Sequence, residues 1–157
     1  MAAPSPVAAD VATGEQFSAA VIGNGERKMI NLSYSRNVDL TFSAAVEKVT
    51  ATLSEMGFGI LTTIDVQATF KAKLNVDFRP YTILGACHPP SALEVLTRQE
   101  EIGLLLPCNV TVSENDDGSI KVSAINAEAM FKVAGDPSLM EVAADVNRKL
   151  KEAVDNV

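Results

Sequence analysis

Two stretches of the chain carry apolar side chains at the spacing of an α-helix, residues 42–56 and 139–154. In the second stretch, Val142, Val146 and Leu150 fall on one stripe, with charged residues between them. A stripe with a period of 3.6 residues is typical of a helix that packs one side against a core. We therefore expect two long amphipathic helices.

Two shorter helices are expected between the long ones. Asp65 is a suitable N-cap for a helix over residues 66–74, because its side-chain oxygen can accept from the first free backbone N–H groups. Pro90 suits the first turn of another helix, which we expect to run to about Ile102 and to end at Gly103.

The remaining apolar runs are short and predict strands, which we place at residues 28–35, 58–64, 81–87, 104–114 and 120–125. A hairpin turn joins the last two, where Asn, Asp, Asp and Gly occupy positions 115–118. A second hairpin is predicted where Gly, Asn and Gly at 23–25 separate residues 17–22 from the strand at 28–35. Hairpins pair strands antiparallel, so the pattern predicts an α+β fold. We expect a mostly antiparallel sheet of about five strands with the two long helices packed on one face.

Length and composition indicate a single domain preceded by an extension. A chain of 157 residues with 47% hydrophobic residues can bury one core without a disulfide scaffold. Residues 1–28 are rich in Ala, Pro, Ser and Gly at their start and predict a flexible or partly ordered N-terminal extension. Residues 29–157 then form the α+β domain. The two long helices cover only one face of the expected sheet. Any apolar part of the other face is therefore a candidate homodimer surface.

The charge of the chain excludes several classes of partner. A net charge of −7 with a pI near 4.7 is unfavourable for nucleic acid or an anionic membrane, since both attract basic surfaces. No apolar run approaches the roughly 20 residues of a membrane span. The N-terminus lacks the pattern of a signal peptide, which predicts a soluble cytoplasmic protein. An Ala/Pro/Ser start would also suit a mature periplasmic protein whose signal peptide was replaced by an initiator Met.

The two cysteines are the main candidates for chemistry. Cys87 and Cys108 each stand where an apolar run meets a turn-forming residue. Three interpretations remain open: small buried hydrophobes, a structural disulfide, or thiols used for redox, sulfur handling or ligand contact. A disulfide would require the two strands to be antiparallel neighbours that bring the cysteines within bonding range.

Other polar residues extend this candidate site. His88 directly follows Cys87, but adjacent residues of an extended chain point to opposite faces, so direct activation of the thiol is geometrically poor. Arg79 and Tyr81 precede the first cysteine, and Arg79 or Lys73 beside a thiol would favour the thiolate or hold an anionic ligand. Cys87, His88 and Cys108 supply at most three zinc ligands without a familiar spacing, so no metal site is predicted. No cofactor is predicted either, because the chain has no P-loop or dinucleotide fingerprint.

Beyond Gly57 the chain resembles the bacterial and archaeal domain-of-unknown-function family three hundred and two. The resemblance covers roughly residues 32–153, and the segments that carry it are Gly57-Phe58-Gly59-Ile60-Leu61, Asp65-Val66-Gln67-Ala68-Thr69, Phe78-Arg79-Pro80-Tyr81, Ile83-Leu84-Gly85-Ala86-Cys87-His88-Pro89 and Ile102-Gly103-Leu104-Leu105-Leu106-Pro107-Cys108-Asn109-Val110. It implies an α+β domain similar to the TATA-binding-protein fold, often homodimeric, with no established reaction. The family pattern has asparagine where this chain has His88, which argues against a histidine-dependent mechanism shared by the family.

Three functional hypotheses follow. The first is a small ligand- or partner-binding domain whose site contains Cys87, His88, Cys108, Arg79 and Tyr81, and whose ligand is a sulfur species, a soft metal ion or another thiol. The second is a thiol redox or sulfur-transfer enzyme with Cys87 as nucleophile and Cys108 as resolving thiol. The third is a structural domain with inert, buried cysteines.

Overall fold

Strands and helices alternate along most of the described part of the chain, residues 31–157 of a computed structural model. In chain order the elements are β1 (Ser33–Val38), α1 (Phe42–Glu55), β2 (Gly59–Asp65), α2 (Val66–Leu74), β3 (Tyr81–Cys87), α3 (Pro89–Arg98), the 3-10 helix η2 (Glu100–Leu105), β4 (Cys108–Glu114), β5 (Ile120–Ile125), α4 (Ala127–Lys132), the 3-10 helix η3 (Pro137–Leu139) and α5 (Met140–Asp155).

The described strands form one antiparallel sheet in the order β1-β5-β4-β3-β2, which leaves β1 and β2 at its edges. Leu84 of β3 lies opposite Val110 of β4, and Val110 lies opposite Ala124 of β5. All three side chains are buried, and cross-strand partners share a face of the sheet. This row marks the face on which the core is built, and the predicted α+β class with an antiparallel sheet is confirmed.

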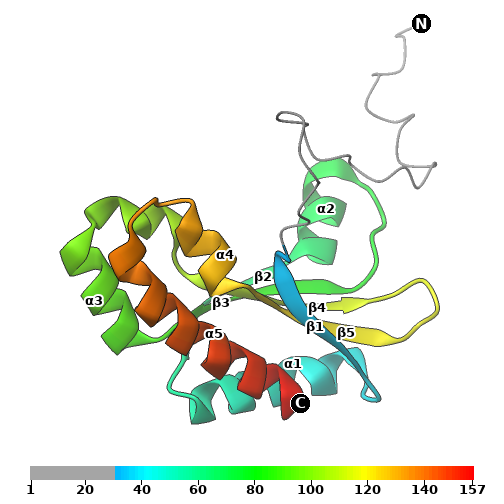
Figure 1. The fold of residues 1–157 in the computed structure, drawn as a ribbon. Helices are drawn as coiled ribbons and strands as arrows, with labels where there is room; N and C mark the ends of the chain where they lie inside the picture. Colours follow the sequence, from blue (N-terminus) through cyan, green and yellow to red (C-terminus); the bar gives the residue numbers. More distant parts are fainter. Residues whose placement is uncertain (1–30) are drawn as a thin grey trace, which may run out of the picture.

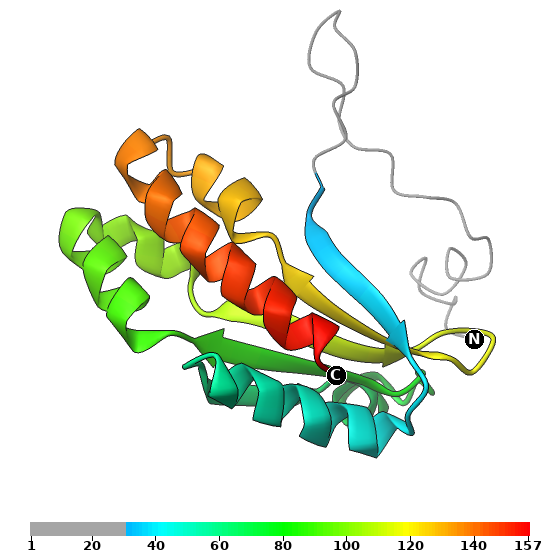
Figure 2. The same ribbon diagram turned by 60° about the horizontal axis from the view of Figure 1, so that its bottom comes forward.

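The two long helices, α1 and α5, cover this apolar face side by side, as Figure 2 shows from below the sheet. Val49 and Leu53 of α1 and Leu150 of α5 are almost completely buried beneath them. The short helix α2 lies on the other side of the strands in Figure 1 and buries none of its residues. Among residues 31–157, no helix combines the length and the apolarity needed to cross a membrane.

The predicted segment boundaries between β3 and β4 were wrong in two places. The helix expected to reach Ile102 ends at Arg98, because Gln99 adopts an extended backbone before η2 begins. This break redirects the chain and allows Ile102 to become buried. The strand expected from residue 104 begins only at Cys108, since η2 occupies the preceding residues and Pro107 has no N–H to donate to the ladder.

Two further elements complete the comparison with the sequence. The short helix α4 was not predicted, although Asn126 caps it by accepting a hydrogen bond from the backbone N–H of Ala129. The first arm and turn of the predicted N-terminal hairpin, like the predicted extension over residues 1–28, lie outside the described residues. Of the predicted strand at 28–35, residues 33–35 belong to β1, which continues to Val38.

Candidate functional site

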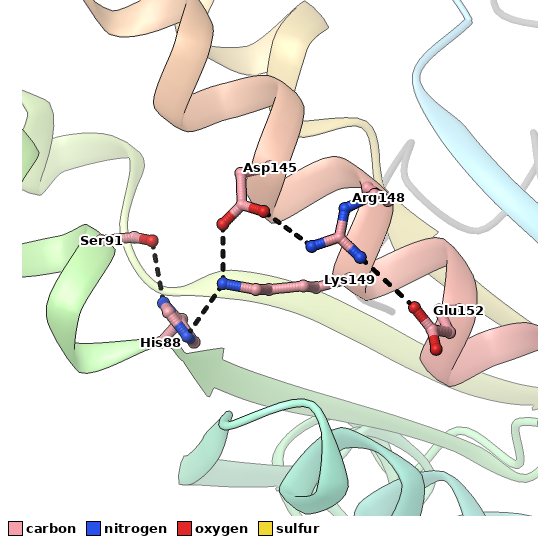
Figure 3. A network of polar contacts seen from close by, with 6 residues as sticks. All are labelled: His88, Ser91, Asp145, Arg148, Lys149 and Glu152. Carbon is pink, nitrogen blue, oxygen red and sulfur yellow. Dashed lines mark hydrogen bonds and ion pairs between the residues drawn. The ribbon is translucent and has the colours of Figure 1, made fainter.

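The end of β3 carries the first two candidate residues. Cys87 is the last residue of the strand and is partly exposed, and His88 is the N-cap residue of α3. The helix starts immediately because Pro89 and Pro90 fit its first turn, where no backbone donor is needed. The chain therefore turns sharply at His88, and its side chain is directed toward α5 (Figure 3).

Cys108 begins the neighbouring strand and is 5% exposed. β3 and β4 are antiparallel neighbours, but the cross-strand partner of Cys108 is Ala86. Cys87 is therefore one residue out of register with Cys108, and both cysteines are free thiols. The structure contains no disulfide between them, so the structural-disulfide interpretation finds no support here.

Both cysteines nevertheless line one small cavity at this end of the sheet, together with His88. The remaining walls are mostly apolar and include Phe131 of α4 and Val146 of α5. The volume of the cavity is about 20 Å³. A cavity of that size holds about one water-sized molecule, so it is too small for an organic ligand without movement of its walls.

The environment of Cys108 keeps its thiol protonated. Burial, and to a lesser extent the proximity of Cys87, raises the pKa of Cys108 to about 12. Removing the thiol from water disfavours its charged form, and no cation compensates for that loss. Cys108 is therefore a poor nucleophile in the folded protein, whereas Cys87 is partly exposed.

His88 joins α3 to α5 through a chain of polar contacts, drawn in Figure 3. Its Nδ1 atom lies 2.8 Å from Oγ of Ser91, and its Nε2 atom lies 3.3 Å from Nζ of Lys149. Lys149 also donates to Asp145 at 2.6 Å, and Asp145 accepts a second bond from Arg148 at 2.8 Å. An ammonium group has no lone pair, so Nε2 of His88 must be the acceptor and Nδ1 must carry the proton.

This arrangement requires a neutral His88. Burial lowers the pKa of His88 below its ordinary value of 6.5, and the positive charge of Lys149 lowers it further. The carboxylate of Asp145 acts in the opposite direction but is the smallest of the three effects. On one side the imidazole packs against the ring of Phe58, at 5.5 Å between centroids. His88 is thus fixed by contacts on several sides, and both of its nitrogens have partners.

The structure does not bring the other two predicted residues to this site. Arg79 forms an exposed ion pair with Asp116 at 3.3 Å, in the turn that follows β4. Tyr81 is the first residue of β3, whereas Cys87 is the last. Six steps of about 3.3 Å along a strand put roughly 20 Å between them. Neither residue can act on the cysteine thiols, and Lys73 is likewise exposed at the end of α2.

Two residues of the observed site were missed by the reading of the sequence, Lys149 and Asp145. They lie one turn apart on α5, and in the sequence they are indistinguishable from the ordinary charged side of an amphipathic helix. Only the packing of α5 against the start of α3 brings Lys149 to His88, and the sequence contains no signal for that contact. Within residues 31–157, no group of three or more His, Cys, Asp or Glu side chains is placed to hold a metal ion.

The fold and this site define a class: an α+β domain with an antiparallel sheet covered by two long helices, with two free thiols at one end. A crystal structure of the uncharacterized conserved protein DUF302 from Bacillus stearothermophilus is similar, with a TM-score of 0.76, 28% sequence identity, and coverage of 80% of this chain and 98% of that one. Residues 34–157 match the family model described as domain of unknown function DUF302, and the chain belongs to that family.

A curated relative is an uncharacterized protein of Aquifex aeolicus (strain VF5), which is 29% identical over 79 residues. That alignment covers 48% of this chain and 55% of the relative, so the chain spans about half the length of the Aquifex protein. The resemblance noted in the sequence is confirmed by the family match, and neither named relative carries an assigned activity.

Proposed function

We propose that this domain binds a small sulfur species at Cys87. The proposal depends on one observation: Cys87 is partly exposed and is one of the residues that line a cavity with room for about one water-sized molecule. Attack of the Cys87 thiolate on the end of a polysulfide chain would form a new S–S bond and break the adjoining one. The shortened polysulfide would leave with the electron pair of the broken bond, and the added sulfur atom would remain on Cys87.

The donor chemistry of the site favours sulfur over a soft metal ion. A metal would need thiolate ligands, and burial holds the Cys108 thiol in its protonated form. A metal would also need a free imidazole nitrogen, and both nitrogens of His88 have hydrogen-bond partners. A bulky thiol such as a thiol peptide exceeds the size of the cavity. A single sulfur atom on Cys87 meets none of these obstacles.

The enzymatic alternative, with Cys108 as the resolving thiol, has less support. Resolution requires Cys108 to attack as a thiolate, and its pKa of about 12 opposes that step. The strand register also pairs Cys108 with Ala86 rather than with Cys87. In our proposal Cys108 is part of the cavity wall, and Cys87 alone accepts and releases sulfur. The purely structural alternative accounts for Cys108 but leaves the accessible Cys87 unexplained.

Intact-mass spectrometry after exposure to inorganic polysulfide tests the proposal. We expect the wild-type protein and Cys108→Ser to gain the mass of one sulfur atom, and Cys87→Ser to gain none. Equal loading of Cys87→Ser, or no loading of the wild type, would overturn the assignment. A parallel sample exposed to copper(I) and desalted separates the two ligand classes, since retention of copper without sulfur loading would favour the soft-metal hypothesis.

We further propose that the domain forms a homodimer through the edge of the sheet at β2. Support comes from apolar side chains that this edge leaves exposed, with Leu61 66% and Ile64 46% accessible. An unpaired edge strand with apolar side chains is a favourable site for association. Light scattering of Leu61→Ser/Ile64→Ser should give a monomer, whereas the matched control Leu93→Ser, on the exposed side of α3, should behave as the wild type. A wild-type monomer at micromolar concentration would refute the proposal.

A further inference from the structure

Helix α5 forms part of the wall of the cavity that both cysteines line. Val146 of this helix is one of the cavity walls, and Lys149 follows three residues later. Residues three apart in a helix lie on the same side, so Lys149 projects from the same side of α5 as Val146 and reaches His88, another residue of the cavity wall. Its side chain is only 21% exposed and ends at His88. The contact between Lys149 and His88 is thus a polar link between α5 and the β3–α3 junction beside this cavity.

The link holds only while His88 can accept a hydrogen bond. A protonated imidazole has two donors and no acceptor, and the neighbouring ammonium of Lys149 has no acceptor either. Protonation would also place two positive charges at the present distance of 3.3 Å. The ring cannot turn away freely, because a Cβ atom on Gly57 would already lie 3.2 Å from it and Phe58 packs against it.

We propose that the His88–Lys149 contact is a pH-sensitive gate over the thiol cavity. Protonation of His88 separates the two side chains, loosens α5 at Val146 and admits small reagents to Cys108. The gate would regulate the site of the proposed function and depends on that function for its biological role. Its movement, however, can be measured without any sulfur ligand.

The charges that act on His88 support separation of His88 and Lys149 when the histidine is protonated. Lys149 of α5 disfavours the protonated ring and Asp145, also on α5, favours it, while Gly57 and Phe58 carry no charge. Cys87 and Cys108 line the adjoining cavity, and the buried Cys108 thiol is neutral. Asp145 already accepts a hydrogen bond from Lys149, so the ammonium would keep a partner after it leaves the ring.

The test uses a Cys87→Ser background, in which Cys108 is the one remaining thiol. Its reaction with dithiodipyridine is followed between about pH 8 and pH 5, and each rate is divided by the rate of free cysteine at the same pH, which removes the intrinsic titration of a thiol. We expect the corrected rate to rise about tenfold toward acid pH, which corresponds to the loss of one ordinary hydrogen bond from a local opening equilibrium.

Two variants in this background decide between the gate and a general loosening. His88→Asn keeps an acceptor for Lys149 but cannot titrate, so its corrected rate should stay low at every pH. Lys149→Met keeps an apolar stem without charge and should also lose the pH dependence. The proposal fails if His88→Asn gives the same rise as the His88 protein. If the rise is present but polysulfide does not load wild-type Cys87, the proposed function fails and the gate stands. If Cys87 is loaded but the rise is absent, the gate fails and the proposed function stands.

Discussion

The Nζ atom of Lys149 lies 3.3 Å from Nε2 of His88, although 61 residues separate the two in the chain. The contact requires a neutral histidine, whose pKa is lowered first by burial and then by the charge of Lys149, and it joins α5 to the start of α3 beside the cavity that both cysteines line. The candidate site is therefore more than a pair of thiols on neighbouring strands. It combines one accessible thiol, one buried thiol and a neutral imidazole held by a lysine.

The two cysteines should differ sharply in reactivity. We expect Cys87 to react with an aromatic disulfide reagent in the native protein at about pH 8. At this pH Cys108 should react far more slowly than Cys87 until the protein unfolds, because Cys108 is 5% exposed and burial raises its pKa to about 12. Cys87→Ser should remove the fast native reaction and leave only the slow reaction of Cys108, whereas Cys108→Ser should leave the fast reaction intact. Equal native rates for the two thiols would show that Cys108 is not shielded as described.

Stability should fall as the pH drops below about 6.5 because of His88. Its pKa is lowered in the folded state, so the unfolded chain binds more protons at this residue than the folded chain does. The free energy of unfolding therefore rises with pH through this range. The contribution of His88 is complete above the unfolded pKa and is lost as the pH falls toward the folded pKa. Urea titrations at about pH 7.5 and pH 5 measure the difference.

His88→Asn is the control for this effect, and it should flatten the pH dependence between those two values. His88 is the single histidine of the chain. The aspartates whose pKa is lowered in the fold, including Asp117, Asp136 and Asp145, start from an ordinary value of 3.8 and act at lower pH. An unchanged slope in His88→Asn would show that other groups cause the loss of stability.

Gly57→Ala should destabilise the protein for two reasons that a matched control separates. Gly57 has φ of +85°, which costs an L-residue about 1–2 kcal/mol, and the added Cβ would lie 3.2 Å from the imidazole of His88. Gly118 has φ of +81°, and nothing lies within 4 Å of the position that a Cβ would take there. Gly118→Ala therefore carries the backbone cost alone. In urea unfolding, a loss no greater for Gly57→Ala than for Gly118→Ala would contradict a tight fit at His88.

Gly85→Ala should be more costly, because the strand has no space at this position. A Cβ there would lie 2.2 Å from Oγ1 of Thr62 and 2.8 Å from Cγ of Pro107. Overpacking of this kind typically costs about 1–3 kcal/mol. Adding Thr62→Ala removes the nearer obstacle, so the double variant should recover part of the loss in a double-mutant cycle. Strict additivity of the two changes would show that Thr62 does not cause the clash.

The sequence by itself determined most of the local structure. Hydrophobic periodicity and turn chemistry placed β3 and β5 at their observed bounds and predicted both long helices, because these patterns are local features of the sequence. It also identified Cys87 and Cys108 as the residues of interest. It placed the end of α3 too late, since the extended Gln99 is required by the burial of Ile102, a tertiary contact.

Only the tertiary structure decided what surrounds the thiols. The pairing of Cys108 with Ala86, the approach of Lys149 to His88 and the position of Arg79 at the far end of β3 all depend on how distant segments pack. Periodicity assigns a residue to the buried or exposed side of its own element, but it contains no information on which side chain of another element it meets. For that physical reason, the sequence predicted the thiols and the fold, whereas the structure identified the lysine that contacts the histidine beside them.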